Sequence, residues 1–525
     1  MRNPWRDKEA SGSSPKLLVT LEAIINKGER KITMMIPWGY LFSGILVLII
    51  VGLICVILLE NRNPHKALSW VLVLMLLPGL GVVLYLLFGR QQWHLKKIQK
   101  HTYDRFDLTD TPSSGTTVKA LPPNEEPYHL LMEMVRYETS AQPLLADEVT
   151  IFRSGLDKVE ALLEDIHNAR QFIHLEYYIF LDDYTGKRIA DALIKKAKEG
   201  VKVRVMCDYV GSFRARGGFF RRMTDAGIEF RQFLKVVMPS LRSDINYRNH
   251  RKVVVIDRMI GYIGGMNIAD HYTVGNHKGC WYDTHFRVTG MAVNGLQSAF
   301  MSDWRFASKI ALSQNYYLSP GQPLPPTTPN LSTAYQNAIK IAQVPMQTFA
   351  SGPTNKFRTL LQAWSRTIYE AKKEIYIETP YFLPTDSLNK ALIGAALSGV
   401  EVHLVLPWNS DSHLVKYASQ SYYADLLEAG VQIHRFDGEF NHSKLLTVDG
   451  RIAYIGSANM DFRSLEYNFE LTAIVYNTPF ANALQSSIQQ NIIEHCQLIS
   501  PAQWQKRSLQ NKLLQSFCRL FSPLL

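Results

Sequence analysis

Cysteine is scarce in this chain of 525 residues, and the cysteines present do not pair by spacing. They are scattered and odd in number, and no two of them have the short spacing of a zinc site. This pattern argues against a disulfide framework and predicts reduced thiols in a reducing compartment, acting as small apolar side chains. The five are Cys55, Cys207, Cys280, Cys496 and Cys518.

Acidic residues are fewer than basic ones: 46 Asp and Glu stand against 57 Lys and Arg, which gives a net charge of +11. Such a balance predicts an anionic partner, either nucleic acid or an anionic lipid surface, and composition does not decide between them. With 46% hydrophobic and 20% charged residues, the chain is expected to be globular rather than disordered. Its length allows two or three domains, each with its own core.

Charge is missing altogether from two apolar runs near the N-terminus, residues 36–59 and 67–88. Each run exceeds the roughly 20 residues that cross a bilayer core, and the apolar region of a signal peptide is shorter, about 7–15 residues. A buried hairpin in a globular core is the alternative, but aromatic residues lie near the ends of the runs, as at membrane interfaces. The sequence therefore predicts a two-helix transmembrane hairpin over residues 34–90, with a kink at Pro78.

Basic residues are distributed unequally around these two runs. Seven precede the first run, two lie in the loop 60–66 and four follow the second run before residue 101. Under the positive-inside rule, both ends of the hairpin face the cytoplasm and the loop lies outside. The rest of the chain is then expected on the cytoplasmic side of the membrane.

After the hairpin, predicted helices and strands alternate in two similar series. This indicates an α/β fold of two tandem domains related by a pseudo-twofold axis, each with a mixed sheet wrapped by helices. Polar and Pro-rich stretches at 109–127 and 319–330 separate the parts. The predicted organisation is a basic segment 1–33, the hairpin 34–90, a linker 91–145, a first domain 146–318, a Pro-rich linker 319–345, a second domain 346–500 and a C-terminal amphipathic helix 501–525.

One motif occurs once in each half. H-x-K-x-x-x-x-D stands at His250, Lys252 and Asp257 and returns at His442, Lys444 and Asp449, and G-[GS]-x-N follows each copy. The copies share a single offset of 192 residues (442 − 250). Two copies in one register indicate an internal duplication and predict one shared site.

Strand periodicity separates the roles within the motif. Residues i and i+2 of a strand face the same side, whereas position i+7 has the opposite parity. His442 and Lys444 are therefore predicted to act together, while Asp449, at a DG turn, orients or supports them. The first copy is interpreted in the same way.

Histidine and lysine in this arrangement suit the chemistry of phosphate esters. The lysines supply positive charge for a phosphate, and Asn267 and Asn459 are expected to donate further hydrogen bonds. One imidazole attacks phosphorus while the other, protonated, gives its proton to the leaving oxygen. Asp283 and Glu470 are the candidates for carboxylates that orient the histidines, unless they are ordinary surface acids. No metal-ligand spacing occurs, and neither a metal nor another cofactor is expected.

These residues resemble the hallmark of the phospholipase D superfamily, over about residues 146–500. The resemblance implies two phospholipase D-like domains, one active site shared between them and a phosphohistidine intermediate. By position, the six catalytic residues would be the histidine, lysine and aspartate of both copies, with His250 as nucleophile and His442 as general acid. Gly265 stands where the second copy has Ser457, so a hydroxyl contact to phosphate is expected on one side only.

A narrower resemblance, to bacterial cardiolipin synthases, is carried by NRNPHKALSWVLVLMLLPGLGVVLYLLFGR, WYDTHFRVTG and GSANMDFRSLEYNFE. It implies that a phosphatidyl group passes between two molecules of phosphatidylglycerol with release of glycerol, at the inner membrane, with anionic membrane lipid as the partner. A phospholipase D-type hydrolase, or a synthase with another acceptor such as serine, is the alternative. The two apolar runs argue against nucleic acid as substrate, and the two intact motifs argue against a catalytically silent scaffold.

The end of the chain carries one more pattern. Apolar residues recur at helical spacing over 509–521, with Lys512 and Arg519 among the remaining positions. This predicts an amphipathic helix that lies either on an anionic leaflet or against the catalytic body.

Overall fold

The structure, a computed structural model, describes residues 17–20, 33–36, 38–60, 64–89, 128–215, 217–235, 247–275, 279–318 and 338–522. These residues fall into two compact units, the smaller within residues 1–94 and the larger within residues 95–525. The predicted linker stretch 109–127, the Pro-rich stretch 319–330 and most of the basic segment 1–33 lie outside the described residues.

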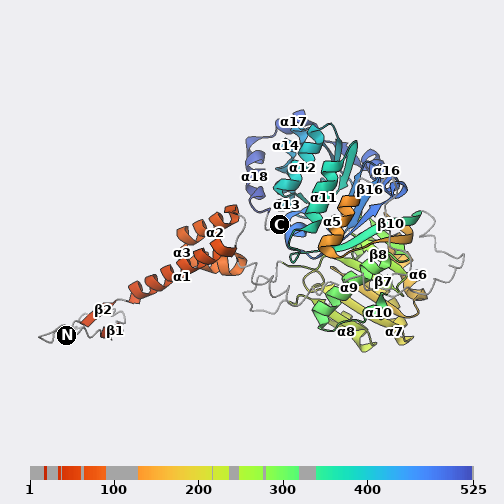
Figure 1. Cartoon of the computed structure of the whole chain (residues 1–525), viewed down its shortest axis with the longest axis horizontal. Helices are drawn as coiled ribbons and strands as arrows, with labels where there is room; N and C mark the ends of the chain where they lie inside the picture. Colours follow the sequence, from red (N-terminus) through yellow and green to blue (C-terminus); the bar gives the residue numbers. More distant parts are fainter. Residues whose placement is uncertain are drawn as a thin grey trace, which may run out of the picture. The chain divides into compact units, whose positions relative to one another are not determined.

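The smaller unit contains one helix long and apolar enough to cross a membrane (Figure 1). This is helix α1, Trp38–Glu60, whose apolar stretch Gly39–Leu59 is largely exposed. Two short strands precede it, β1, Leu17–Thr20, and β2, Thr33–Ile36, and they pair antiparallel.

The second apolar run does not form the single spanning helix that was expected. It divides into α2, Pro64–Leu76, α3, Pro78–Leu84, and a π-helical turn η1, Tyr85–Gly89. The break falls at Leu77, with φ −129° and ψ 64°, because a proline has no N–H to donate and disfavours helical geometry in the residue before it. Among the described residues one helix, and not a pair, has the length of a full span.

The larger unit is built on a continuous sheet of 15 strands, in the order β19-β14-β13-β11-β15-β16-β18-β10-β3-β9-β8-β7-β4-β5-β6. The first half contributes β3, Pro143–Phe152, β4, Phe172–Tyr177, β5, Lys202–Asp208, β6, Glu229–Phe233, β7, Lys252–Ile256, β8, Ile260–Gly264, and β9, His285–Thr289. The second half contributes β10, Ile339–Ser351, β11, Glu374–Glu378, β13, Glu401–Pro407, β14, Gln432–Phe436, β15, Leu445–Val448, β16, Ile452–Gly456, β18, Glu470–Tyr476, and β19, Cys496–Leu498. Two short strands, β12, Phe382–Leu383, and β17, Met460–Asp461, pair separately.

Strand order makes the duplication visible. Outward from the central pair, the first half runs β3-β9-β8-β7-β4-β5-β6 and the second runs β10-β18-β16-β15-β11-β13-β14-β19, so every strand of the first half has a counterpart in the second, which adds β19 at its edge. Strands β3 and β10 pair antiparallel and join the two halves into one sheet. Strands β4, β5 and β6 of the first half are parallel, as are β11, β13 and β14 of the second, while the inner strands and the edge strand β19 pair antiparallel.

Helices cover both faces of this sheet (Figure 1). Successive residues of β7 point to different cores, as the pleat of a strand requires: Val253 and Val255 to one face, Val254 and Ile256 to the other. On the first face, α9, Val293–Ser308, and α16, Thr478–His495, share one apolar core across both halves. On the second face each half has its own core. The core of the first half lies under three helices: α6, Gly155–Asn168, α7, Tyr184–Lys198, and α8, Gly217–Asp225. The core of the second half lies under another three: α11, Thr359–Glu370, α12, Asp386–Leu397, and α14, Tyr423–Glu428.

Two predicted linkers contain secondary structure. Helix α5, His129–Thr139, lies within the interval 91–145, and its residues Leu131 and Val135 are buried in the core of the second half. Strand β10 begins at Ile339, inside the predicted linker 319–345. Local patterns do not reveal these two elements, because both pack against partners far away in the sequence.

The cysteines agree in part with the prediction. All five are free, and Cys207 and Cys518 are buried. Cys280 and Cys496 are half-buried, while Cys55 is exposed on α1.

Candidate active site

The two motifs meet at one cavity of about 410 Å³ in the larger unit. His250 and His442 both line it, as do Asn267 and Asn459. Its other walls are mostly aromatic and apolar, formed by Tyr178, Ile179, Tyr272, Trp281, Tyr381, Leu383 and Val415, with Arg248, Asp411, Ser412, Asp461, Arg463 and Asn468 as the polar part. The structure thus brings the histidines of both halves to a single site, of a size typical for small-molecule binding.

Each histidine is fixed at the entrance of a strand by the asparagine before it. Asn249 Oδ1 accepts the N–H of Arg251 at 3.1 Å, and Asn441 Oδ1 accepts the N–H of Ser443 at 3.0 Å. These tight turns place each imidazole directly ahead of its strand, so the short sequence N-H-x-K encodes both the turn and the functional side chain.

The two halves exchange backbone partners next to the histidines. The His250 N–H donates to Phe469 O at 2.9 Å, and the His442 N–H donates to Tyr282 O at 2.6 Å. Phe469 precedes Glu470 in the chain, and Tyr282 precedes Asp283. Each half therefore delivers a carboxylate to the histidine of the other half.

Glu470 orients His250. Both carboxylate oxygens lie 3.1 Å from His250 Nδ1, and Asn468 Nδ2 and Ser457 Oγ donate to the same carboxylate. Burial alone would raise the pKa of Glu470, but the neighbouring His250 and Lys252 and the hydrogen bonds lower it to about 2. Glu470 is therefore ionised, and it holds the Nδ1 proton so that Nε2 of His250 keeps its lone pair.

Asp283 occupies the equivalent place beside His442. Its Oδ2 lies 2.7 Å from His442 Nδ1, and its other oxygen accepts the N–H of Thr284. Burial raises the pKa of Asp283 to about 7, against the opposing charge of Lys444. Tyr272 Oη, 3.2 Å from His442 Nδ1, also approaches this nitrogen. The pair formed by His442 and Asp283 is thus closer to holding a proton near neutral pH than the pair formed by His250 and Glu470.

Burial dominates the titration of the remaining motif residues. It lowers the pKa of His250 to about 4, although Glu470 opposes this, and it holds the pKa of His442 well below the ordinary value, together with Lys444 and Lys252. It also lowers the pKa of Lys252 to about 7 and that of Lys444 to about 8. By itself the site therefore disfavours the protonated imidazole that was expected from the sequence.

The lysines lie beneath the histidines rather than in the wall of the cavity. Each ammonium donates to the backbone carbonyl of the histidine two residues before it. Lys444 Nζ also lies 2.9 Å from His442 Nδ1 and 3.3 Å from His442 Nε2. The predicted pairing of histidine and lysine on one side of the strand agrees with this geometry.

Asp257 and Asp449 stand outside the site, at the far ends of β7 and β15. Asp257 accepts the N–H groups of Arg170, Gln171 and Phe172 at 2.7 to 2.8 Å. Asp449 accepts those of residues 372–374 at 2.8 to 3.0 Å. Because a strand rises about 3.3 Å per residue, the length of β7 separates Asp257 from the cavity by about 16 Å. Both aspartates fix the turn between a helix and a strand, as the parity of the motif indicated, and the catalytic role that the resemblance implies for them stays a prediction.

Of the other predicted residues, some line the cavity and some lie behind it. Asn267 lines the cavity, but its Nδ2 donates to Tyr272 Oη at 2.9 Å and its Oδ1 accepts the N–H of Ile179. Asn459 Nδ2 donates to Asp461, while its Oδ1 has no hydrogen-bond partner among the described residues. Ser457 supports Glu470 instead of facing a phosphate. A Cβ on Gly265 would lie 2.2 Å from Asp283 Oδ1, so the glycine makes room for Asp283.

Aromatic residues around the histidines were not predicted. The ring of Tyr178 lies 5.0 Å from that of His250, and the ring of Trp281 lies 5.1 Å from that of His442. Trp281 stands two residues before Asp283 in the conspicuous segment CWYDTHF, which was a usable signal. Tyr178 follows an ordinary buried strand, and no local pattern distinguished it.

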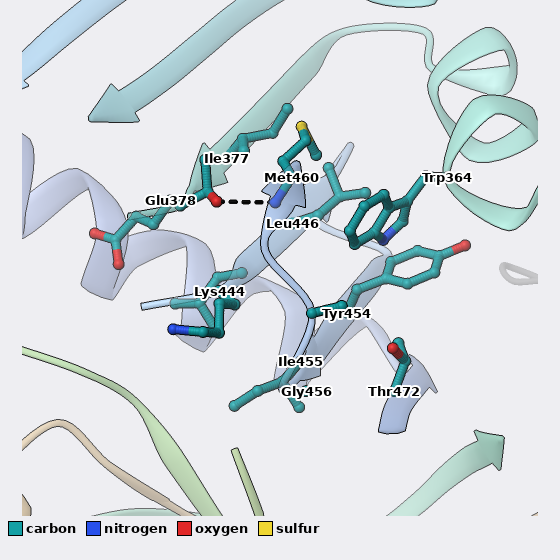
Figure 2. Close-up of a pocket in the computed structure, with 13 residues that line it drawn as sticks. Trp364, Ile377, Glu378, Lys444, Leu446, Tyr454, Ile455, Gly456, Met460 and Thr472 are labelled. Carbon is teal, nitrogen blue, oxygen red and sulfur yellow. Dashed lines mark hydrogen bonds between the residues drawn. The ribbon is translucent and has the colours of Figure 1, made fainter. Parts of the chain in front are cut away.

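A second and much smaller cavity, of about 20 Å³, lies behind Lys444 in the core of the second half (Figure 2). The rings of Trp364 and Tyr454 and the side chain of Leu446 line one side of it, while the ammonium of Lys444 and the carboxylate of Glu378 lie on the other. Met460 N donates to Thr379 Oγ1 at 3.0 Å beside it. This volume holds about one water molecule, so it is a packing defect of the core rather than a binding site. Across the described ranges, no three His, Cys, Asp or Glu side chains gather as a metal ion would require.

Comparisons with known proteins agree with this architecture. The family model for the PLD-like domain of cardiolipin synthase matches residues 162–304 and 365–492, one stretch in each half, and the phospholipase D-nuclease N-terminal model matches residues 47–90. A cardiolipin synthase of Geobacillus thermodenitrificans is 36% identical over 498 residues, covering 93% of this chain and 95% of that protein. Cardiolipin synthase 1 of Bacillus anthracis is 36% identical over 495 residues, covering 93% and 94%.

A solved structure supports the fold alone. Phosphatidylserine synthase of Haemophilus influenzae superposes with a TM-score of 0.57 at 15% identity, over 76% of this chain and 100% of that one. The family model matches both halves, and the similarity to cardiolipin synthases extends along nearly the whole chain. Both findings agree with two phospholipase D-like domains that share one site. The chain belongs to the cardiolipin synthases of the phospholipase D superfamily.

Proposed function

We propose that this protein is a cardiolipin synthase that transfers a phosphatidyl group from one phosphatidylglycerol to another through a phosphohistidine. The observation that carries the proposal is the pair of buried imidazoles on one cavity, each with its Nδ1 against a carboxylate from the opposite half. Such a pair can supply a nucleophile and an acid at the same phosphorus.

His250 is the better nucleophile. Glu470 is ionised and fixes Nδ1–H, so Nε2 of His250 attacks phosphorus and the bond between phosphorus and the glycerol oxygen breaks. His442, in its protonated form, gives its proton to that oxygen, and glycerol leaves. In the second step the hydroxyl of another phosphatidylglycerol gives its proton to His442 and attacks phosphorus, and the bond between phosphorus and Nε2 breaks. His250 is thereby restored, and cardiolipin forms.

A bound phosphodiester completes the charge balance of the site. Burial depresses the pKa values of both histidines and both lysines in the free protein. An anion placed between them favours every protonated form, and therefore raises these pKa values. His442 would thus take up a proton when substrate binds, so that it can act as an acid only in the complex with substrate.

Transfer to an alcohol, and not to water, calls for a poorly hydrated site. Water competes at about 55 M, so an acceptor must be held beside the phosphohistidine. The aromatic and apolar walls formed by Tyr178, Trp281, Leu383 and Val415 suit the glycerol and acyl parts of a lipid. A phospholipase D-type hydrolase, or a synthase with serine as acceptor, is the alternative.

The reaction is tested with purified full-length protein and labelled phosphatidylglycerol, with the products resolved by mass. Cardiolipin and glycerol in equal amounts are expected. Phosphatidic acid as the sole product would replace the proposal with hydrolysis, and a product formed only when serine is added would identify another acceptor.

The nucleophile is tested by trapping the phosphatidyl-enzyme. The His250→Ala variant is expected to trap none, whereas His442→Ala accumulates some, because it lacks only the acid. Equal trapping by the His250→Ala variant would overturn the assignment.

We also propose that both apolar runs enter the bilayer, with both ends on the cytoplasmic side. The excess of basic residues before the first run and after the second supports this orientation. The bend at Leu77 is compatible with insertion, because neighbouring helices can satisfy the backbone groups that a proline frees. Reporter fusions after residue 62 and after residue 95 test it: a periplasmic reporter should be active only at residue 62.

A further inference from the structure

The C-terminal helix α18, Leu509–Arg519, packs on the larger unit by its polar edge. Gln515 and Cys518 are buried there, and Gln515 Nε2 donates to Gln420 Oε1 of helix α13, His413–Gln420, at 3.1 Å. Its apolar edge points outward: Leu509, Leu513, Phe517 and Leu520 are 58 to 73% exposed. An amphipathic helix of a globular protein normally buries that edge, so the orientation needs another explanation.

The charge of this segment indicates what would cover the apolar edge. Residues 501–525 contain no Asp or Glu, while Lys506, Arg507, Lys512 and Arg519 supply four positive charges. Apolar side chains flanked by cations suit an anionic lipid surface, where acyl chains receive the former and phosphates pair with the latter. A second copy of the same face would bring like charges together, and therefore suits it less.

Helix α13 links this edge to the active site. Helices α18 and α13 lie side by side, and Cys518 shares an apolar cluster with Ala418 and Leu383 (Figure 1). Val415 of α13 packs against this same cluster and lines the cavity, as does Leu383. One apolar cluster therefore connects α18 to the wall of the cavity that holds the histidines.

The first half also exposes apolar side chains beside the cavity. There the connection from β5 to α8 carries Val210 and Phe213, which are exposed. Between them, Ser212 Oγ donates at 3.1 Å to the backbone oxygen of Tyr178, whose side chain lines the cavity. Exposed apolar groups thus stand next to the cavity walls of both halves.

We propose that α18 is a membrane-docking helix, which inserts its apolar edge into an anionic lipid surface and, through α13, holds the cavity next to the bilayer that supplies the lipid. Docking itself is independent of the reaction; the supply of lipid to the cavity rests on the proposed function.

Docking is tested with a photoreactive side chain, p-benzoylphenylalanine, at position 513 of the full-length protein in vesicles of phosphatidylglycerol and phosphatidylethanolamine. Illumination should attach lipid to this position, detected by the mass of the peptide that contains it. The same probe at position 397 of α12, where Leu397 is 71% exposed, should gain none. Attachment to a second copy of the chain, or no lipid at position 513, would overturn the proposal.

The kinetic test separates docking from folding. The double variant Leu513→Gln/Phe517→Gln should turn over vesicle phosphatidylglycerol about tenfold more slowly, because two inserted side chains are lost. It should match the unaltered protein on short-chain phosphatidylglycerol in detergent. The control Leu397→Gln/Ile493→Gln removes two apolar residues elsewhere that are at least as exposed, and it should retain both activities. An equal loss in detergent would show a structural role instead. Failure of the unaltered protein to form cardiolipin would refute the proposed function, while the lipid attachment at position 513 would still decide the docking.

Discussion

At the scale of single residues, the two halves of the site differ in what supports each carboxylate. Glu470 receives hydrogen bonds from Ser457 and Asn468 in addition to His250. Asp283 has the N–H of Thr284 and the space left by Gly265. Burial raises the pKa of Asp283 to about 7, whereas for Glu470 the effect of burial is outweighed by His250, Lys252 and the hydrogen bonds, which lower its pKa to about 2.

The role of Glu470 is tested by Glu470→Gln. The amide cannot balance charge that develops on His250, so we expect phosphatidyl-enzyme formation to slow by about 10² to 10³-fold. Rapid-quench trapping with labelled phosphatidylglycerol measures this step directly. Glu428→Gln, an exposed glutamate on α14, is the matched control and should react at the normal rate. A normal rate in both variants would remove Glu470 from the mechanism.

The lysines predict a pH dependence. In the free protein the pKa values of Lys252 and Lys444 are about 7 and about 8, because burial disfavours the ammonium forms. Since kcat/KM reports the free enzyme, it should fall as the pH rises through 7 to 8 and the lysines lose charge. The fall in kcat should lie at higher pH, because the bound phosphate raises both pKa values. Initial rates on short-chain phosphatidylglycerol in detergent provide the test, and coincident alkaline limbs would contradict it.

At the scale of elements, the aspartate of each motif ties the turn between a helix and a strand. Asp257 stands at φ 51° and Asp449 at φ 54°, a region that aspartate and asparagine tolerate better than most residues. Each carboxylate accepts three backbone N–H groups from the start of the neighbouring strand. These hydrogen bonds indicate that the two aspartates support the sheet.

Asp257→Asn should therefore destabilise the protein without disabling the site. Asparagine keeps the backbone geometry but loses part of the hydrogen bonding and the charge, at an expected cost of about 2 kcal/mol. Thermal unfolding in detergent should show a lower Tm, while the turnover rate of the folded protein stays within about threefold of normal. If turnover instead fell by about a hundredfold or more at unchanged Tm, Asp257 would return to the catalytic group.

Some elements could be predicted from the local sequence, and others could not. The repeated H-x-K-x-x-x-x-D motif located both histidines and both lysines, because its spacing matches a strand that begins at the site. Pro78 predicted a kink, but not the division of the run into two short helices. Helix α5 was taken as linker, because its buried residues face the second half of the protein, more than 200 residues further along the chain.

At the scale of the whole molecule, neither half contains a complete site. His250 of the first half contacts Glu470 of the second, and His442 of the second half contacts Asp283 of the first. The halves are also joined along β3 and β10 and through the apolar core beneath α9 and α16. The sequence predicted that the two motifs share one site. It did not predict this exchange of carboxylates, because the exchange depends on how the two halves of the sheet pack together.

Separating the halves should preserve activity only when both are present. We expect a chain ending near residue 325 and a second chain starting there to be inactive alone and active when co-expressed, because strand pairing and a shared core reunite them. Cardiolipin formation by membranes of the co-expressing cells measures this. Mixing a His250→Ala first half with an unaltered second half is the control and should remain inactive. Activity of either half alone would show that a complete site forms without the exchange.

The exchange of carboxylates also bears on how such a chain could have arisen. A single half would have been able to complete its site only by pairing with an identical copy, and both positions would then carry the same residue. Gly265 on one side and Ser457 on the other are a difference that only a tandem chain can encode. Two copies joined in one polypeptide can thus place different residues around their two histidines, and a tandem chain can give the two histidines different environments in a way that a pair of identical copies cannot.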